Sequence, residues 1–243
     1  MKPPAYFLLP GLSAFLLFSL LSPFFSRAAQ SPPDPADAAR KAKIDLIRQI
    51  AEDAAFYQRL QFNPDTIVPN WVVAQAKGVL ILERWPGPPA VDGNGQGIGM
   101  LKGSDKKYGA PAFYTLGNST IGLQIGPASV HLVAFLMTDK ALLSLTSNQF
   151  SWSGNLHAVA GSSSSTSAPA GATPDVILFQ KAADLNAAAN IASTTISVNT
   201  ANNVFFYDKP GVTPTDIFRG KVDMPKATAP LVDAFNQQSG SPE

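Results

Sequence analysis

Residues able to carry out chemistry are few in this sequence. It has no cysteine and two histidines, His131 and His157, which excludes thiolate nucleophiles, thiolate zinc sites and a three-histidine metal site. His131 lies in the apolar run 130–137, where alternation places it on the face of Val133 and Phe135 and favours a hydrogen-bonded core histidine. His157 has no recognisable Ser or Asp arrangement around it, and the chain has no Gly-x-Ser-x-Gly motif. The sequence gives little support to a hydrolase that uses His157 or scattered carboxylates, and we expect no enzymatic activity.

The glycine-rich run 93–99 could in principle hold a phosphate or a metal ion. It lacks the lysine and hydroxyl residue that complete a phosphate-binding loop, and its alternating glycines do not fit the dinucleotide spacing. Residues 92–97 imitate the start of a calcium loop, but Gly103 stands where the closing bidentate glutamate is needed. The run therefore predicts a glycine-rich hairpin, and we expect neither a metal site nor a cofactor.

A third group of candidate residues lies on the helix predicted over 37–61. Its apolar residues recur at steps of three and four and form one stripe: Ile44, Ile47, Ile50, Ala51, Ala54 and Tyr57. Its basic residues could face anionic lipid: Arg40, Lys41, Lys43, Arg48 and Arg59. Asp45 and Glu52 are spaced to pair with Lys41 and Arg48. The pattern therefore fits either a helix on a membrane surface or a core-packed helix with a solvated face.

Composition narrows the class of protein further. The 243 residues are 45% hydrophobic and only 14% charged, with a formal net charge of +1. Nucleic-acid binding needs a clear basic excess, so we expect no such partner. A disordered tail protein needs high charge and few apolar residues, so that class is also excluded.

The first 28 residues have the pattern of a cleaved secretory leader. Lys2 precedes the uncharged apolar run 7–25, and the small residues Ser26 and Ala28 mark a cut after Ala28. A retained membrane helix is the alternative, because a span needs about 20 apolar residues. We expect an exported protein, periplasmic or extracellular and peripheral on a membrane.

The elements behind the lead-in predict an α+β fold with a mainly antiparallel sheet, barrel-like or sandwich-like, N-terminal helices and short C-terminal helices. Helices are expected over 37–61, 69–76, 140–145, 213–219 and 225–235, with Pro230 kinking the last. Strands are expected over 79–85, 98–102, 112–116, 120–125, 130–137, 149–160, 176–180, 190–198 and 204–207. We divide the chain into the leader 1–28, a lead-in with the amphipathic helix 29–63, and one domain 64–238 with a mobile serine-rich loop at 162–173.

Five runs of the predicted domain resemble the SYLF-domain family. They lie at 76–82 (AKGVLIL), 110–126 (APAFYTLGNSTIGLQIG), 130–145, 158–161 (AVAG) and 203–221. The resemblance covers about 64–235. One stretch departs from it, because 177–192 lacks the family's glycines, has Asn186 in place of an aromatic residue and keeps only Lys181 as a basic residue.

Membership of this family implies a lipid-binding module without enzymatic activity. Its eukaryotic members bind phosphoinositides with the help of an N-terminal amphipathic helix, and some act on actin, while its bacterial members are exported envelope proteins. For this chain the resemblance implies binding of anionic phospholipid at a membrane surface, with Lys181 joining the five basic residues of the helix. An actin partner is not expected for an exported bacterial protein. The alternative is a structural or protein-interaction module of the bacterial envelope without lipid affinity.

Overall fold

The computed structural model describes residues 34–62, 67–84, 95–117, 130–151, 158–160, 174–180 and 195–239. The chain divides into two compact units, Met1–Asp34 and Pro35–Glu243, and the architecture below is that of the second unit. Several predictions fall outside the described residues: the leader 1–28, the strand 120–125, the loop 162–173, His157 and Lys181. None of the described helices is long and apolar enough to cross a bilayer.

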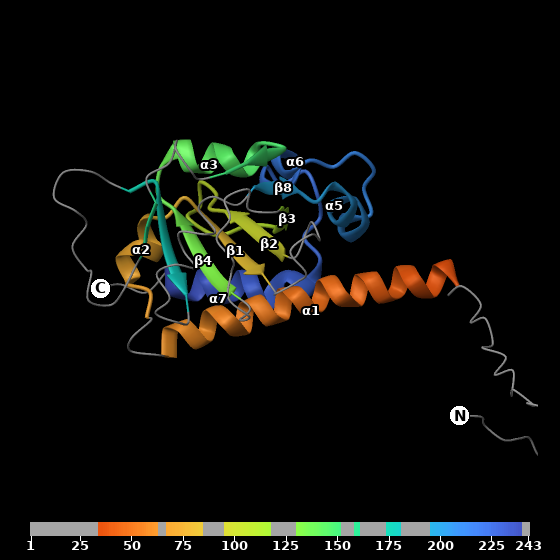
Figure 1. The fold of residues 1–243 in the computed structure, drawn as a ribbon, viewed down its shortest axis with the longest axis horizontal. Coiled ribbons are helices and arrows are strands. Elements are labelled where there is room, and N and C mark those ends of the chain that lie inside the picture. The colour runs from red at the N-terminus through yellow and green to blue at the C-terminus, as the bar shows by residue number, and fades with distance from the viewer. Residues whose placement is uncertain are drawn as a thin grey trace, which may run out of the picture. The chain divides into compact units, whose positions relative to one another are not determined.

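A single sheet forms the middle layer of the described residues (Figure 1). Its eight strands are β1 (Gly78–Arg84), β2 (Gly95–Leu101), β3 (Ala112–Leu116), β4 (Val130–Leu136), β5 (Gln149–Phe150), β6 (Ala158–Ala160), β7 (Val176–Gln180) and β8 (Ile196–Val198). The spatial order is β5-β8-β3-β2-β1-β4-β7-β6. Neighbouring strands are antiparallel, except that β6 runs parallel to β7. The sheet is thus open and curled, with very short strands at both edges.

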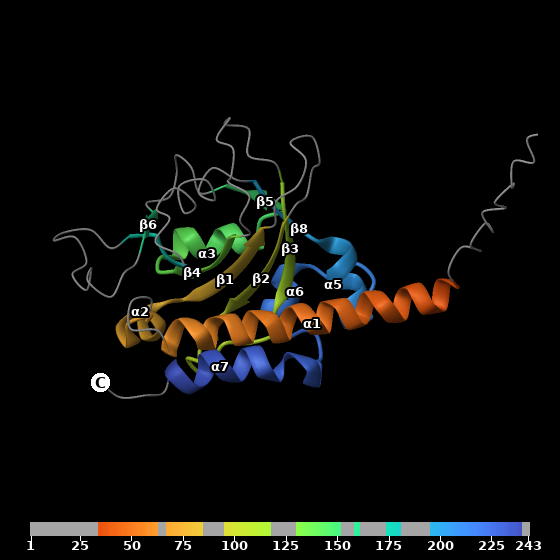
Figure 2. The same ribbon diagram turned by 60° about the horizontal axis from the view of Figure 1, so that its bottom comes forward.

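Helices cover both faces of this sheet. Figure 2 shows α1 (Pro35–Phe62) lying beside α7 (Ala229–Ser239) across one face, with α2 (Asn70–Gln75) at its end. The opposite face carries α3 (Asp139–Thr146) and α6 (Pro214–Phe218). Together the layers confirm the predicted α+β class, with one curled antiparallel sheet as its centre.

Alternation along the central strands supplies the two cores. In β1, Val79 and Ile81 face the α1–α7 layer, while Leu80 and Leu82 face the α3 layer, and all four are fully buried. Because successive side chains of a strand point to opposite faces, a strand buried on both sides reads as a continuous apolar run. The run at 79–82 is therefore explained by helices on both sides of the sheet.

Three alternating glycines let large side chains pack closely on β2. A Cβ at Gly97 would lie 2.7 Å from Leu82 Cδ2, and a Cβ at Gly99 would lie 2.9 Å from the Tyr114 ring. At Gly95 the obstacle is the backbone oxygen of Glu83, 2.8 Å away. The structural interpretation of the glycine run is confirmed for Gly95–Leu101, although β2 begins three residues before the predicted strand.

The strand predicted over 204–207 is wrong, because this segment is helical. It forms the end of α5 (Thr200–Tyr207), which begins where the Asn199 side chain accepts a hydrogen bond from the backbone N–H of Asn202. It ends at Asp208, which has a left-handed backbone conformation (φ 49°). Both ends carry ordinary helix-capping chemistry, which outweighs the β-propensity of the run VFFY.

The C-terminal helices follow the predicted order with one correction. Thr213 and Asp216 form a reciprocal capping box at the start of α6, with Pro214 in its first turn. Pro230 does not kink the last helix, because α7 begins at Ala229 and the proline lies in the first turn. A proline there removes no intrahelical hydrogen bond. A short 3₁₀ turn, η1 (Lys226–Thr228), precedes α7.

Candidate functional site

The first part of α1 extends beyond the sheet, as the orange-red end of the helix shows in Figures 1 and 2. Residues 35–44 are all exposed, and continuous burial against the domain begins only at Leu46. From there the buried stripe of α1 contains Leu46, Gln49, Ile50, Asp53, Ala54, Phe56, Tyr57 and Leu60. The helix therefore has a packed half and a projecting half.

The outward face of α1 carries large apolar side chains, two of which belong to the apolar stripe identified in the sequence. Ile44 and Ile47 are 48% and 38% exposed, and Phe62 at the other end of the helix is 87% exposed. Ile44 and Phe62 are eighteen residues apart, about five turns at 3.6 residues per turn, so they lie on one line. Of the six stripe residues, Ile50, Ala54 and Tyr57 are buried, whereas Ile44, Ile47 and Ala51 are exposed. The core-packed alternative therefore describes only half of the stripe, because the sheet contacts a face of α1 centred on Gln49, Asp53 and Phe56.

All five predicted basic residues of α1 are exposed. Asp45 accepts hydrogen bonds from Lys41 at 3.0 Å and from Arg48 at 3.1 Å, and Lys41 in particular holds the pKa of that carboxyl below its ordinary value. The Lys41–Asp45 pairing is as predicted, whereas Arg48 pairs with Asp45 instead of Glu52. Lys181, the sixth predicted residue, lies outside the described residues.

A buried ion-pairing contact joins the packed half of α1 to β4. Asp53 Oδ1 lies 2.8 Å from His131 Nε2, and the Asp53 side chain is only 2% exposed. The His131 ring stacks on Phe56 with centroids 3.7 Å apart. Burial raises the pKa of Asp53 to about 6, against the opposing effect of its hydrogen bond with His131. The prediction of a hydrogen-bonded histidine on the face of Val133 and Phe135 is confirmed.

Sequence reasoning overlooked Asp53, although one signal could have found it. The residue sits between Ile50 and Tyr57 on the buried stripe of α1, where a carboxylate is costly without a partner. A lone acid on an apolar stripe indicates a polar partner on the surface that the stripe contacts. That partner, His131, is 78 residues away in the sequence.

A row of polar side chains crosses the rim of the sheet next to this pair. Glu83 of β1 is in register with His131 of β4 on one side and with Gln96 of β2 on the other. Gln96 Nε2 donates a hydrogen bond of 3.1 Å to Glu83 Oε2. Glu83 and His131 of this row and one flank of α1 line an open pocket of about 350 Å³, whose full lining is Arg48, Ala51, Glu52, Ala55, Arg59, Glu83 and His131.

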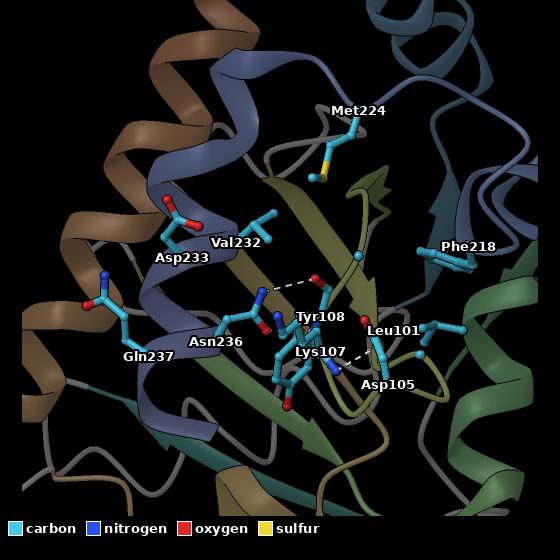
Figure 3. A pocket seen from close by; sticks show the side chains of 12 residues that line it. Leu101, Asp105, Lys107, Tyr108, Phe218, Met224, Val232, Asp233, Asn236 and Gln237 are labelled. Carbon is cyan, nitrogen blue, oxygen red and sulfur yellow. Dashed lines mark hydrogen bonds between the residues drawn. The ribbon is translucent and has the colours of Figure 1, made fainter. Parts of the chain in front are cut away.

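A larger pocket of about 650 Å³ lies between α7 and the turn that joins β2 to β3 (Figure 3). Its central polar groups already serve the fold. The Asn236 side chain accepts from the backbone N–H of Tyr108 at 2.7 Å and donates to its carbonyl at 3.2 Å. Asp105 accepts from the backbone N–H of Lys107 at 3.1 Å. The Asn236 contacts anchor the turn to α7, and the Asp105 contact lies within the turn, so these polar groups serve the fold.

The described residues contain no group of three or more His, Asp or Glu side chains that could hold a metal ion. The charged side chains that line the 350 Å³ pocket offer ion-pairing and hydrogen-bonding chemistry. Its two arginines come from the helix that sequence analysis selected. Glu52 comes from the same helix, whereas Glu83 and His131 come from the central strands β1 and β4.

Fold and pocket together define an α+β domain with a long amphipathic helix laid across one curled sheet. A family model described as Las17-binding protein actin regulator (Ysc84), the SYLF-domain family, matches residues 117–238. The match spans half of the chain, and the chain belongs to this family, as the resemblance implied. No curated protein and no solved structure matches it. The matched range starts just after β3, ends within α7 and does not include α1.

Proposed function

We propose that this protein binds anionic phospholipid at a membrane surface through the outward face of α1, as a binding module with no chemical step. The observation that carries the proposal is the line of exposed apolar side chains along that face, Ile44, Ile47 and Phe62, beside exposed basic residues. The opposite face of the same helix is already packed on the sheet. The outward residues are thus not required by the core.

The chemistry of this face suits an interfacial helix. Such a helix buries an apolar face a few ångströms into the boundary between headgroups and acyl chains, while Lys and Arg stay at the headgroups. The part of α1 up to Arg48 carries four basic residues and two acids, Asp37 and Asp45. Each basic residue near an anionic surface contributes about 1 kcal/mol, and burying an isoleucine fully contributes about 1.5–3 kcal/mol.

Family membership is consistent with this proposal but does not specify it. The family is named for binding Las17 and regulating actin, which is a statement about relatives. Export after cleavage behind Ala28 is part of the proposal and is supported by the composition of the first 28 residues. An exported location would place the anionic surface on a membrane of the cell envelope.

Vesicle sedimentation of the purified protein tests the proposal. We expect it to pellet with vesicles containing phosphatidylglycerol, cardiolipin, phosphatidic acid or phosphoinositide, to remain soluble with purely neutral vesicles, and to bind less at high salt. Replacing Ile44 and Ile47 with serine should abolish pelleting. Replacing Lys41 and Arg48 with glutamate should weaken it at least tenfold.

A matched control separates this site from bulk charge. Lys140 on α3 and Lys209 after α5 are exposed residues outside α1, and their double replacement by glutamate changes the net charge by the same amount. We expect that variant to pellet almost as the wild type does. Equal losses in both charge variants, or no pelleting of the wild type with any vesicle, would refute the proposal and direct attention to a protein partner.

A further inference from the structure

We propose that the 350 Å³ pocket between α1 and the sheet rim binds a zwitterionic phosphate ester that carries a primary ammonium, as in phosphoethanolamine. The ligand could be the headgroup of a lipid or a free ester. Where it is a lipid headgroup, the inference rests on the proposed function and adds selectivity to it. The pocket lies at the lower end of the size range of small-molecule sites, so it would take a headgroup without its acyl chains.

The balance of charge in the lining argues for a ligand with both signs. Arg48 and Arg59 bring two guanidinium groups, and Glu52 and Glu83 bring two carboxylates. A bare anion, or a headgroup with several phosphates, would have to approach both carboxylates. A bare cation would meet both guanidinium groups. A zwitterion can place its phosphate on an arginine and its ammonium on a glutamate, where charge-assisted hydrogen bonds form on both sides.

The positions of these groups along α1 match a short zwitterion. Arg48 and Glu52 are four residues apart, so they stand about one turn from each other on one side of the helix. Arg59 lies two turns beyond Glu52, so the two guanidinium groups flank the carboxylate. In phosphoethanolamine two carbons separate the ester oxygen from the ammonium. This spacing is comparable to the one helical turn between Arg48 and Glu52.

Several of these groups have unused binding capacity. Arg59 and Glu52 are exposed and form no ion pair with any other described residue. Glu83 Oε2 accepts from Gln96, which orients the carboxylate, and Glu83 Oε1 accepts no hydrogen bond from the described chain. That second oxygen is free to accept from an ammonium group.

His131 provides a fixed wall for the ligand. Its Nε2 is held by Asp53 and its ring is stacked on Phe56, yet the side chain remains 20% exposed and lines the pocket. One ring nitrogen is thus committed to the fold: Nε2 donates to Asp53, so Nδ1 of the neutral ring is an acceptor and remains to accept a hydrogen bond from the ammonium of the ligand. A ring held on two sides pays little conformational entropy on binding.

Titration calorimetry of the purified protein with soluble probes tests the inference. We expect phosphoethanolamine to bind, and inorganic phosphate, ethanolamine and phosphocholine each to bind at least tenfold more weakly. The E83Q and R59Q variants should each lose at least tenfold in affinity for phosphoethanolamine, whereas the exposed K140Q variant should not. Circular dichroism should show that E83Q remains folded, and R59Q alters only an exposed side chain. Inorganic phosphate binding as tightly as phosphoethanolamine, or no loss in either variant, would overturn the inference.

Two further experiments are needed. The first distinguishes a lipid headgroup from a free ester as the ligand, and the second distinguishes binding in the pocket from membrane binding by the outward face of α1. At a fixed fraction of phosphatidylglycerol, vesicles with phosphatidylethanolamine should recruit the protein better than vesicles with phosphatidylcholine, and E83Q should remove that difference. Equal recruitment would assign the pocket to a free ester. The Ile44→Ser/Ile47→Ser variant should lose vesicle binding yet keep its affinity for soluble phosphoethanolamine. Loss of the soluble ligand in the isoleucine variant would contradict a separate pocket.

Discussion

Replacing Asp53 with asparagine should make the protein more stable at neutral pH. Asp53 is almost completely buried, and burial raises its pKa from 3.8 to about 6. An amide has nearly the same shape, cannot ionise, and can still accept the hydrogen bond from His131 Nε2 through Oδ1. The substitution therefore removes the buried charge and keeps the contact, while desolvation of the new amide N–H groups offsets part of the gain.

The magnitude follows from the shift in pKa. Between about pH 4 and pH 6 the folded chain holds a proton on Asp53 that the unfolded chain has released, so the stability contributed by this group falls as pH rises. Each pKa unit corresponds to about 1.4 kcal/mol, so the ionised form costs about 3 kcal/mol at pH 7. We expect Asp53→Asn to gain up to about that amount at pH 7 and almost nothing at pH 4. For a chain of this size the gain corresponds to about 6–12 °C in Tm.

Urea unfolding of both proteins at pH 4, 5, 6 and 7 measures this difference. Comparing variant with wild type at each pH cancels the other titrating groups, because they are common to both. Asp45→Asn on the same helix is the matched control. Its carboxyl is solvent-exposed and has a lowered pKa, so any stability that it contributes is present at neutral pH and lost on acidification, the opposite sign. An Asp53→Asn variant that is no more stable at pH 7, or whose advantage does not change with pH, would refute the reasoning.

Two further predictions concern the packing around β2 and β3. Asn203→Ala should lower the free energy of unfolding by roughly 2 kcal/mol, because the fully buried amide accepts from the backbone N–H of Phe113 at 2.8 Å; an unchanged urea midpoint would argue that this N–H finds another acceptor. Gly95→Ala should cost about 1–3 kcal/mol, because its Cβ would lie 2.8 Å from the backbone oxygen of Glu83, whereas Gly109→Ala has only one contact, at 3.9 Å. Thermal unfolding compares the two variants, and equal Tm values would count against the steric argument.

The elements that sequence patterns predicted well are those with a local cause. The continuous apolar run of β1, the capping box of α6 and the cap of α3, where the Thr138 side chain accepts from the backbone N–H of Ala141, each depend on neighbouring residues. The helix at 200–207 was missed because its apolar core VFFY has high β-propensity, although the capping residues Asn199 and Asp208 were available as evidence against a strand.

The candidate site was only partly predictable, because it depends on what α1 contacts. Helical periodicity locates Arg48 and Arg59 on one side of the helix, but it cannot tell which side the sheet covers. That choice placed Ile44 and Ile47 in solvent and Asp53 in the core. The contact of Asp53 with His131 and the register of Glu83 with Gln96 join distant segments. Such pairings are set by the tertiary fold and leave little trace in the local pattern.

The short strands at the two ends of the sheet have a consequence for self-association. A long flat edge exposes unpaired N–H and C=O groups, and it is a template to which another chain can add a strand. Here the described edge strands, β5 and β6, have two and three residues. They offer little ladder to a second molecule, so growth of the sheet into edge-to-edge polymers is disfavoured. A protein with isoleucine and phenylalanine side chains exposed on α1 is thereby protected from one common route to aggregation.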